Sequence, residues 1–379
     1  MVVEQTCSRC VMDTSDRDID FDSKGVCSYC REATRLLPKY HFTKDEEKVN
    51  LAKLADTITK RRKGEYDSII GLSGGVDSSY VAYLAWKLGL KPLCVHFDNG
   101  WNSEISVSNI NKIIEITGFD FTTYVIDWPE FRDLQRSFVK AGVIDIEMLT
   151  DHAIWAAMFR ICRKNRIAFV LTGTNYTSEH GMPRSWLWRK QDLRNIKAIH
   201  GQFGERKLKS FPVMGSLRFA IAESFAIGGT GLQPLNLINY RKTEAMEVLK
   251  TVFGWRYYGG KHYESIFTKF YQAFILPEKF GVDKRRAHLS ALIRNDEMTR
   301  DEAIAELAKP LYDLGDLKQD KEYVLKKLGF SEQEFSSFIK APPVPHDFYP
   351  SDAVWIHPLM AFKKRLIRSG FIRGNDSEQ

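Results

Sequence analysis

The chain has 379 residues, enough for two or three domains with a sizeable hydrophobic core. Its fractions of 44% hydrophobic and 27% charged residues are those of an ordinary globular protein, and no apolar run is long enough to span a membrane. The net charge of +7 fits a small anionic substrate such as a nucleotide as well as it fits a nucleic acid. The N-terminal MVVEQTCSRC lacks the apolar segment of a secretory signal, so we expect a cytoplasmic protein.

Four of the cysteines form two Cys-X-X-Cys pairs near the N-terminus. Cys7 pairs with Cys10, and Cys27 pairs with Cys30. This spacing is typical of a zinc site in which each pair contributes two thiolates from a tight turn. Four protein ligands leave no open position on the metal, so the sequence predicts a structural Zn²⁺ site in a zinc-ribbon-like module over residues 1–50. Two unrelated pairs of reduced cysteines are the alternative.

The remaining two cysteines, Cys94 and Cys162, stand alone in apolar surroundings. The first lies in 93-LCVHF-97 and the second in the helix-like 153-AIWAAMFRIC-162. Free cysteines of this kind are usually buried. We therefore expect both to act as small hydrophobic residues rather than as nucleophiles.

From residue 66, short apolar runs alternate with amphipathic helical patterns. This alternation predicts βαβ units and an α/β fold with a parallel sheet, in which ligands bind beyond the carboxyl ends of the strands. The expected strands are Ser68–Leu72, Leu93–Phe97, Thr122–Ile126, Ala168–Leu171 and Gln233–Leu237. The expected helices are about Asp77–Leu88, Ile105–Thr117, Pro129–Ala141 and Asp145–Asn165.

The segment 73-SGGVDS-78 joins the first expected strand to the first helix. Its two glycines let the backbone turn tightly and approach a ligand, and the free amides of the first helical turn form an anion site best suited to phosphate. Ser73, Ser78 and Ser79 add hydroxyl donors. Asp77 is placed either to cap the helix or to hold a metal that bridges phosphates. A plain glycine turn with an aspartate cap is the simpler alternative.

This segment has neither the lysine of GxxxxGK[ST] nor the spacing of GxGxxG, which argues against kinase-type and dinucleotide-binding loops. SGGVDS instead resembles the pyrophosphate loop of the N-type ATP pyrophosphatases, the PP-loop superfamily. These enzymes cleave ATP to AMP and pyrophosphate, and they adenylate a carbonyl oxygen so that a nitrogen or sulfur nucleophile displaces AMP. The resemblance implies an adenine nucleotide alpha-hydrolase-like core over residues 51–253, with ATP and Mg²⁺ as cofactors.

Two further segments follow expected strands at the corresponding positions. They are 96-HFDNGW-101 and 171-LTGTNYTSEHG-181. The resemblance implies that Asp98 lies near the ribose or the metal, and that Gly173, Thr174 and Asn175 close over the nucleotide. A simple strand-to-helix turn is the alternative for each segment. The ATP-binding residues that the resemblance implies are Leu72, Ser73, Gly74, Gly75, Asp77, Ser78, Ser79, Phe97, Asp98, Gly173 and Thr174.

Residues 254–379 form a region that we expect to be mainly helical and to contribute to the substrate site. It contains 259-GGKHYES-265 and 276-LPEKFGVDKRRAH-288. Together with the cysteine pairs, SGGVDS, HFDNGW and TGTN, these segments look like the N-acetyl sugar amidotransferases of bacterial surface-polysaccharide synthesis. The resemblance runs from Cys7 to about Lys309, and the two C-terminal segments are its specific part, since SGGVDS alone indicates only the superfamily.

This resemblance implies a definite reaction in the synthesis of lipopolysaccharide, O-antigen or a related surface glycan. The amide oxygen of a nucleotide-activated acetamido sugar, UDP-linked by expectation, attacks the α-phosphorus of ATP and releases pyrophosphate. Ammonia then displaces AMP and leaves an acetamidino group. Amide oxygens are poor leaving groups, and adenylation allows the oxygen to leave as AMP. Little general-acid chemistry is then required, so positioning and charge neutralisation dominate the catalysis.

Residue roles are carried over onto matching positions. Asp77 and Glu264 would hold Mg²⁺, and His262 would receive or relay a proton from ammonia. Three basic residues of the C-terminal region would neutralise phosphate charge on ATP or on the sugar nucleotide, namely Lys261, Lys284 and Arg285. Surface charge or helix capping is the alternative for each C-terminal residue taken singly. The candidate catalytic residues are Asp77, Lys261, His262 and Glu264, and the candidate substrate-binding residues are Asn175, Lys284 and Arg285.

The source of ammonia is constrained by what the chain carries at position 2. An N-terminal catalytic glutaminase needs cysteine there, and this chain has Val2. The sequence also has no nucleophile-elbow cysteine with a His-X-Glu partner, so we expect no glutaminase activity in this chain. The resemblance implies a separate glutaminase subunit that supplies ammonia, with a synthase-like subunit as a relay.

A tRNA-modifying enzyme of the same superfamily, thiolating or lysidine-forming, is the main alternative. It shares SGGxDS and zinc-binding cysteine pairs, and the basic charge fits RNA. Thiolating patterns place catalytic cysteines in the central domain, where only Cys94 and Cys162 lie, and no long basic arm is present. We therefore do not expect nucleic acid as a partner. A non-enzymatic nucleotide-binding or assembly module would leave GGKHYE unexplained.

Capping boxes predict two helix starts near the C-terminus. They are Thr299 with Glu302 and Ser331 with Glu334. A proline cluster at 342–345 should end the second of these helices. The stretch 351–368 is expected either to pack back as a helix or to dock a partner.

Overall fold

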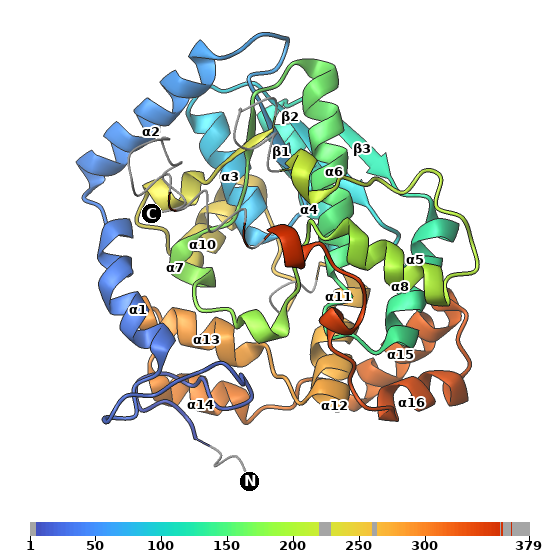
Figure 1. Ribbon diagram of the computed structural model, residues 1–379. Helices are drawn as coiled ribbons and strands as arrows, with labels where there is room; N and C mark the ends of the chain where they lie inside the picture. Colours follow the sequence, from blue (N-terminus) through green and yellow to red (C-terminus); the bar gives the residue numbers. More distant parts are fainter. Residues whose placement is uncertain (1–4, 220–228, 260–263, 357, 359–364, 366–379) are drawn as a thin grey trace.

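The computed structural model describes residues 5–219, 229–259, 264–356, 358 and 365, and its centre is a five-stranded parallel sheet (Figure 1). The strands are β1 (Ser68–Gly71), β2 (Pro92–Asp98), β3 (Phe121–Val125), β4 (Phe169–Leu171) and β5 (Thr230–Leu232). Their order is β3-β2-β1-β4-β5, with every neighbouring pair parallel. The chain moves outward from β1 to β3 and then returns to β4 on the other side. The crevice at such a reversal is where ligands bind in parallel α/β sheets.

Helices cover both faces of the sheet. The first face carries α3 (Val76–Lys87), α4 (Glu104–Thr117) and α10 (Lys242–Phe253), and the second carries α6 (Met148–Asn165). Ile69 and Ile70 are neighbours in β1, so their side chains point to opposite faces. Ile70 joins a hydrophobic cluster with α3, α4 and α10, whereas Ile69 joins one with Met158 and Cys162 of α6. The helix α2 (Lys44–Lys60) adds Leu54 to the first cluster.

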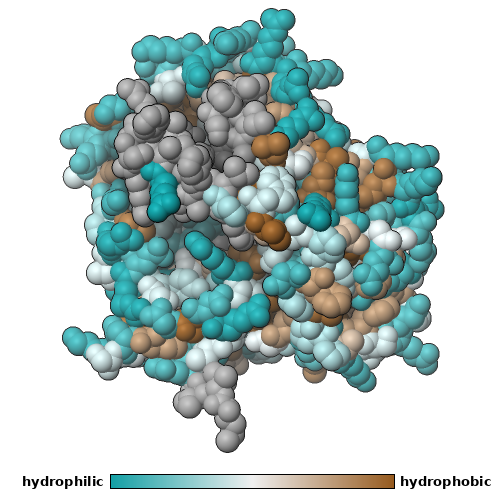
Figure 2. Space-filling view, in the orientation of Figure 1, coloured by the Kyte–Doolittle hydropathy of each residue, from teal (hydrophilic) through white to brown (hydrophobic). Residues whose placement is uncertain are grey.

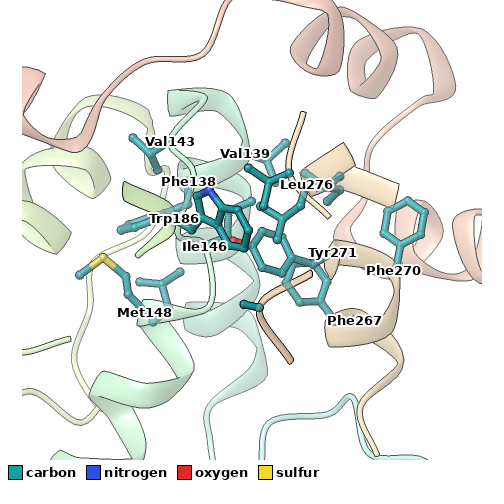
Figure 3. Close-up of a cluster of buried hydrophobic side chains, with 14 of the residues drawn as sticks. Phe138, Val139, Val143, Ile146, Met148, Trp186, Phe267, Phe270, Tyr271 and Leu276 are labelled. Atoms are coloured by element: carbon teal, nitrogen blue, oxygen red, sulfur yellow. The ribbon is translucent and has the colours of Figure 1, made fainter. Parts of the chain in front are cut away.

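The C-terminal helices lie at the lower half of Figure 1 and share one large core with α5 (Trp128–Ala141). Figure 3 shows part of it, where Phe138 and Val139 of α5 meet Tyr271 and Leu276. A π-helical turn, Tyr271–Ile275, joins α11 to α12. The other helices are α1 (Ser28–Leu36), α7 (Tyr176–Glu179), α8 (Leu193–Phe203), α11 (Ile266–Phe270), α12 (Leu276–Phe280), α13 (Arg285–Arg294), α14 (Arg300–Leu307), α15 (Leu314–Leu328) and α16 (Glu332–Lys340), with 3₁₀ turns at Leu37–Tyr40, Arg184–Trp186, Pro234–Leu237 and His346–Phe348.

The parallel α/β sheet predicted from the alternating pattern is confirmed. The first four strands and the four intervening helices agree with the expected ranges to within three residues at each end. The fifth expected strand, Gln233–Leu237, is wrong, because those residues form a 3₁₀ turn and the strand is the preceding Thr230–Leu232. Pro234 explains the difference, since it has no N–H for a strand ladder and its fixed φ suits the first position of a helix.

The two capping boxes are also confirmed. Thr299 and Glu302 exchange hydrogen bonds at the start of α14, and Ser331 and Glu334 do so at the start of α16. The helix α16 ends at Lys340, just before the prolines. Most of the expected 351–368 element lies outside the described residues, and the division at residues 50 and 253 stays a prediction.

Cys94 and Cys162 are fully buried, as expected. Burial raises the pKa of each thiol to about 12, which keeps both protonated and unreactive at neutral pH. None of the helices that the structure describes combines the length and the apolar character needed to cross a membrane. On the face shown in Figure 2, the described surface is mainly hydrophilic and its hydrophobic side chains occur in small groups.

His346 fastens the segment after α16 to the core. Its Nε2 accepts a hydrogen bond from the Asp145 N–H at 3.2 Å, and its Nδ1 lies 2.9 Å from the Asn195 side-chain oxygen. The ring stacks on Trp188 with centroids 5.0 Å apart. Burial lowers the pKa of His346 from 6.5 to about 4, so the folded protein holds this ring neutral.

This burial predicts a loss of stability in mild acid. As the pH falls below the ordinary histidine pKa of 6.5, the unfolded chain takes up a proton that the folded ring cannot accept until about pH 4. We expect His346 to lower the free energy of unfolding by up to about 2 kcal/mol between about pH 7 and about pH 5. Guanidinium unfolding of wild type and His346→Gln at both pH values measures this term. Equal pH dependence in the two proteins would contradict it.

Candidate active site

The carboxyl ends of β1, β2 and β4 open into a cavity of about 830 Å³. Leu72 and Ser73 line it after β1, Phe97 near the end of β2, and Thr174 and Asn175 after β4. From there the cavity extends to the start of α6 and to the C-terminal helices α11 and α13. The lining at that far end is Glu147, Asp151, Lys190, Thr268, Gln272, Lys284 and His288. The cavity therefore lies at the sheet position where the sequence predicts the site, and it has two chemically different ends.

The glycine loop after β1 is held from outside by two side chains. Gly74 has φ +80°, and an added Cβ would lie 2.4 Å from the Ser106 carbonyl oxygen of α4. The Trp255 indole N–H donates to the Gly74 carbonyl at 2.9 Å, and the Asn109 side-chain N–H donates to the same carbonyl at 3.4 Å. Only glycine fits at position 74, because the turn needs both a positive φ and a close approach to α4.

The hydroxyls of Ser73 and Ser78 face each other across this loop, with their oxygens 3.1 Å apart. The Gly75 N–H donates to the Ser73 hydroxyl at 3.2 Å. Ser79, in contrast, is fully buried within α3. The loop thus presents two of its three predicted hydroxyls beside the amides of the first helical turn.

Asp77 does not cap α3, which corrects one of its two expected roles. Gly75 is the N-cap residue and makes no side-chain cap. The Asp77 carboxylate instead accepts a hydrogen bond from the Tyr240 hydroxyl. Burial, followed by the charge of Asp77, raises the pKa of Tyr240 well above its ordinary value, so the phenol stays a donor. The loop after β4 also packs against Asp77, since a Cβ added at Gly173 would lie 2.9 Å from the Asp77 Cβ.

Glu264 approaches the same glycine loop from the C-terminal region. A Cβ at Gly75 would lie 3.2 Å from the Tyr258 hydroxyl oxygen and 3.4 Å from a Glu264 carboxylate oxygen. The Glu264 backbone is tied to the loop after β2, because the Ser103 N–H donates to its carbonyl at 2.8 Å. Lys261 and His262, the other two catalytic candidates of this segment, lie outside the described residues.

Tyr258 sits between the two carboxylates. Its hydroxyl accepts a hydrogen bond from the Val76 N–H at 3.3 Å, one of the amides expected to face phosphate. Burial, then the charges of Glu264 and Asp77, raise the pKa of Tyr258. Both carboxylates therefore influence the Tyr258 hydroxyl beside the loop. Carboxylate oxygens are ligands that Mg²⁺ prefers, so the chemistry of Asp77 and Glu264 suits the predicted role of each as a Mg²⁺ ligand.

Asp98 does not line the cavity. The other predicted ATP-binding residues outside its lining are Gly74, Gly75, Asp77, Ser78, Ser79 and Gly173. The Asp98 carboxylate accepts hydrogen bonds from the Gly100 N–H at 2.8 Å and from the Asn102 amide at 3.0 Å. His96, which was not predicted, lines the cavity instead. Its Nδ1 lies 3.1 Å from the Leu72 carbonyl and its Nε2 lies 3.0 Å from the Asn102 side-chain nitrogen. These partners favour the tautomer with a proton on Nδ1.

Lys284 reaches the far end of the cavity, but Arg285 does not. Lys284 is 9% exposed, and its ammonium lies 4.0 Å from the Glu147 carboxylate. The same carboxylate accepts a hydrogen bond from the Gln272 side chain at 3.3 Å. Arg285 instead bonds Asp283 at 2.8 Å and the carbonyls at the end of α14. Asn175 caps α7 by accepting from the Ser178 N–H at 2.9 Å while it lines the cavity.

Lys190 adds a second cation at the far end. Its ammonium lies 2.7 Å from Asp145 and 3.1 Å from Asp151. Burial opposes the charged form, but these two carboxylates outweigh it and raise the pKa of Lys190. This end of the cavity therefore offers fixed charges of both signs together with amide and hydroxyl groups, which suits a polar, hydroxyl-rich ligand.

Sequence reasoning missed several residues of this site. Tyr258 immediately precedes 259-GGKHYES-265, and its aromatic neighbours Trp255 and Tyr257 are a usable signal. Tyr240, Glu147, Lys190 and Gln272 carry no local motif. Glu147, Lys190 and Gln272 come together because α6, the loop before α8 and the C-terminal helices line the same cavity, whereas Tyr240 reaches Asp77 from the segment before α10.

The four N-terminal cysteines come together as a cluster separate from the cavity. Their sulfur atoms all lie within 4.8 Å of one another, with Cys10–Cys27 at 3.7 Å and Cys7–Cys30 at 4.0 Å. A tetrahedral zinc–thiolate site has sulfur atoms about 3.8 Å apart, so the cluster fits Zn²⁺. The backbone N–H groups of Arg9, Cys10 and Cys27 donate to the Cys7 sulfur at 3.3–3.4 Å.

The hydrogen bonds among the four thiols lower the pKa of Cys7 and Cys10 and raise the pKa of Cys27 and Cys30. Hydrogen bonds from the thiols of Cys10, Cys27 and Cys30 lower the pKa of Cys7, with a further contribution from the Cys10 backbone N–H. A deprotonated sulfur is the form that binds metal. All four cysteines are fully buried, so the centre offers no open position to a substrate.

Comparisons with known proteins point to the C-terminal part of the chain. Residues 264–363 match the family described as "LPS biosynthesis protein WbpG-like, C-terminal domain". The match includes Glu264, Gln272, Lys284 and His288 of the cavity lining. Among solved structures, the NMN synthetase from Francisella tularensis is similar at 16% identity and a TM-score of 0.30, over 57% of this chain and 89% of that chain. No curated protein matches the chain.

Proposed function

We propose that the chain is an ATP-dependent N-acetyl sugar amidotransferase of the PP-loop superfamily, acting in the synthesis of lipopolysaccharide or a related surface glycan. One observation carries this proposal. A single cavity joins the SGGVDS loop at the carboxyl end of β1 to the C-terminal region that matches the WbpG-like family. A nucleotide end and a polar far end in one cavity are what a reaction between ATP and a sugar nucleotide requires. Both substrates are cytoplasmic compounds, so the proposed reaction belongs in the cytoplasm.

In the first step, the loop amides and the hydroxyls of Ser73 and Ser78 bind the β- and γ-phosphates of ATP. The acetamido oxygen of the sugar attacks the α-phosphorus, and the bond from that phosphorus to the bridging oxygen breaks. Pyrophosphate leaves, and the sugar carries an adenylated imidate. Asp77 and Glu264 would hold Mg²⁺, which offsets phosphate charge when it is bound. The Tyr240 hydroxyl orients the Asp77 carboxylate for this task.

In the second step, ammonia adds to the imidate carbon and the carbon–oxygen bond to AMP breaks. The product is an acetamidine, which takes up the proton that ammonia brings. Lys284, Gln272 and Glu147 line the end of the cavity where the sugar nucleotide would lie. A separate glutaminase subunit, with a synthase-like relay subunit, is proposed as the source of ammonia.

The thiolating form of the tRNA-modifying alternative is weakened by the burial of the two central cysteines, whereas the lysidine-forming one needs no cysteine and is left to the assay. Thiolation in this superfamily needs a cysteine that carries or receives sulfur beside the adenylate. Cys94 and Cys162 are fully buried, and burial raises the pKa of each to about 12. Neither thiol is in a position to form a persulfide or to attack a substrate.

The test is a direct activity assay. The protein is mixed with Mg·ATP, ammonium and a UDP-linked diacetamido uronic acid, and pyrophosphate and the mass of the sugar are followed. We expect sugar-dependent pyrophosphate release and replacement of one amide oxygen by NH.

Asp77→Asn should abolish both signals, whereas Asp56→Asn, which alters an exposed carboxylate paired with Lys60 on α2, should leave them unchanged. Pyrophosphate release that depends on tRNA instead of on the sugar would overturn the proposal in favour of the RNA-modifying alternative. Release that needs neither the sugar nor tRNA, with the sugar mass unchanged, would exclude this acceptor.

A further inference from the structure

The helix α13 presents two different sets of side chains on its two sides. Lys284, at its N-cap, and His288 are one turn apart, and both line the cavity. Arg286, Ser290 and Arg294 are also spaced by single turns. Side chains two residues apart on an α-helix point about 200° apart. The second set begins two residues after Lys284, so it points away from the first set. The side of α13 opposite the cavity faces the N-terminal cysteine module.

Three side chains fasten the first cysteine turn to α13 and α14. Arg286 donates to the Val11 carbonyl at 3.0 Å and forms an ion pair with Asp13 at 2.9 Å. The Val11 N–H donates to the Ser290 hydroxyl at 3.2 Å. Arg300 of α14 donates to the carbonyls of Cys10 and Cys7 at 3.2 and 3.3 Å. The backbone that carries two metal ligands is thus bonded directly to the helix that carries two cavity residues.

Arg294 adds a buried charge at the same contact. It is 2% exposed and donates to the His180 carbonyl at 3.1 Å, while its Nε and Nη1 have no hydrogen-bond partner among the described residues. A buried cation without an anionic partner is costly. Arg294 lies on the same side of α13 as Arg286 and Ser290, which bond the first cysteine turn. Zn²⁺ with four thiolates would carry two net negative charges, which would offset the charge of this guanidinium.

We propose that the metal-bearing cysteine module positions the far end of the cavity through α13. The filled centre fixes the first cysteine turn, that turn fixes the outer side of α13, and α13 thereby holds Lys284 and His288 in place. Naming this end as the acceptor end rests on the proposed function. The nucleotide end is supported separately by α3, α4 and α10, so the module acts on acceptor binding and not on ATP binding.

The closing experiment compares Arg286→Gln with Arg31→Gln in the metal-loaded protein. Arg31 is the matched control, because it also pairs with an aspartate of the module, Asp20, and donates to a module carbonyl at 2.7 Å, but it makes these contacts inside the module. Hydrogen exchange of α13 is measured alongside zinc content, ATP affinity and affinity for the UDP-linked diacetamido uronic acid.

We expect Arg286→Gln to keep its zinc, to speed exchange across α13 by about tenfold and to weaken sugar-nucleotide binding by about tenfold, since it loses a charged hydrogen bond and an ion pair. ATP affinity and exchange in α3 should match wild type. Arg286→Lys should restore part of both effects, and Arg31→Gln should show neither. Ser290→Ala, which removes only the bond to Val11, should show the same pattern at smaller size if Arg286→Gln fails to fold.

Unchanged exchange in α13 and unchanged sugar-nucleotide binding in Arg286→Gln would overturn the proposed coupling, and so would an equal effect of Arg31→Gln. If the sugar nucleotide fails to bind even to wild type, the proposed function fails, but the exchange measurement still decides whether the module holds α13.

Discussion

Replacing Gly74 with alanine should lower sugar-dependent pyrophosphate release by at least about a hundredfold, because displacement of a positioning loop by about 1 Å costs that much in comparable sites. Gly74 has φ +80°, and a Cβ at this position would lie 2.4 Å from the Ser106 carbonyl oxygen. Backbone on α4 cannot yield without moving the helix, so the loop must shift. The amides that are expected to hold pyrophosphate would shift with it.

Gly89→Ala is the matched control for this substitution. Gly89 also has a positive φ, +67°, but an added Cβ would meet no atom within 4 Å. Both variants should lose about 1 kcal/mol of stability from the left-handed backbone, and only Gly74→Ala should lose ATP cleavage. Pyrophosphate release measured for both variants, together with their thermal unfolding, separates the two effects. Wild-type release by a folded Gly74→Ala protein would show that this loop is not the pyrophosphate site.

Replacing Cys7 with serine should remove the bound zinc and destabilise the N-terminal module by several kcal/mol, since a closed four-thiolate site contributes its binding energy to folding. Cys7 is the best choice because its sulfur accepts three backbone N–H bonds as well as belonging to the cluster. Metal analysis of the purified variant and its unfolding curve measure both effects.

The matched control here is Cys94→Ala, which removes a buried thiol in β2, far from the cluster in the fold. It should keep one zinc per chain while losing some stability to the cavity left behind. A Cys7→Ser protein that retained one tightly bound zinc per chain would mean that the metal is held by other residues.

The predicted site residues divide by where the structure puts them. Ser73, Thr174 and Lys284 line the cavity, and Glu264 approaches the glycine loop from the other end of the chain. Asp98 is occupied by hydrogen bonds within its own loop, and Arg285 by hydrogen bonds to Asp283 and to carbonyls at the end of α14. Motif matching treats all members of a motif alike, whereas each side chain's direction depends on the turn in which it stands.

By itself the sequence determined the features that short-range rules control. Alternating apolar runs and helices specify a parallel sheet, SGGVDS specifies a tight turn into a helix, and the capping boxes specify two helix starts. The cysteine spacing specifies a metal cluster because two tight turns suffice to bring four sulfur atoms together.

Only the tertiary structure decided which distant side chains complete the site. Three contacts join elements that are far apart in the chain. Tyr240 donates to Asp77, Tyr258 bonds the glycine loop, and Glu147 lies beside Lys284. The sequence of α13 alone does not show that one side contacts the cysteine module and the other lines the cavity. Such contacts follow from the way whole helices pack around the sheet, and no local pattern of residues encodes that packing.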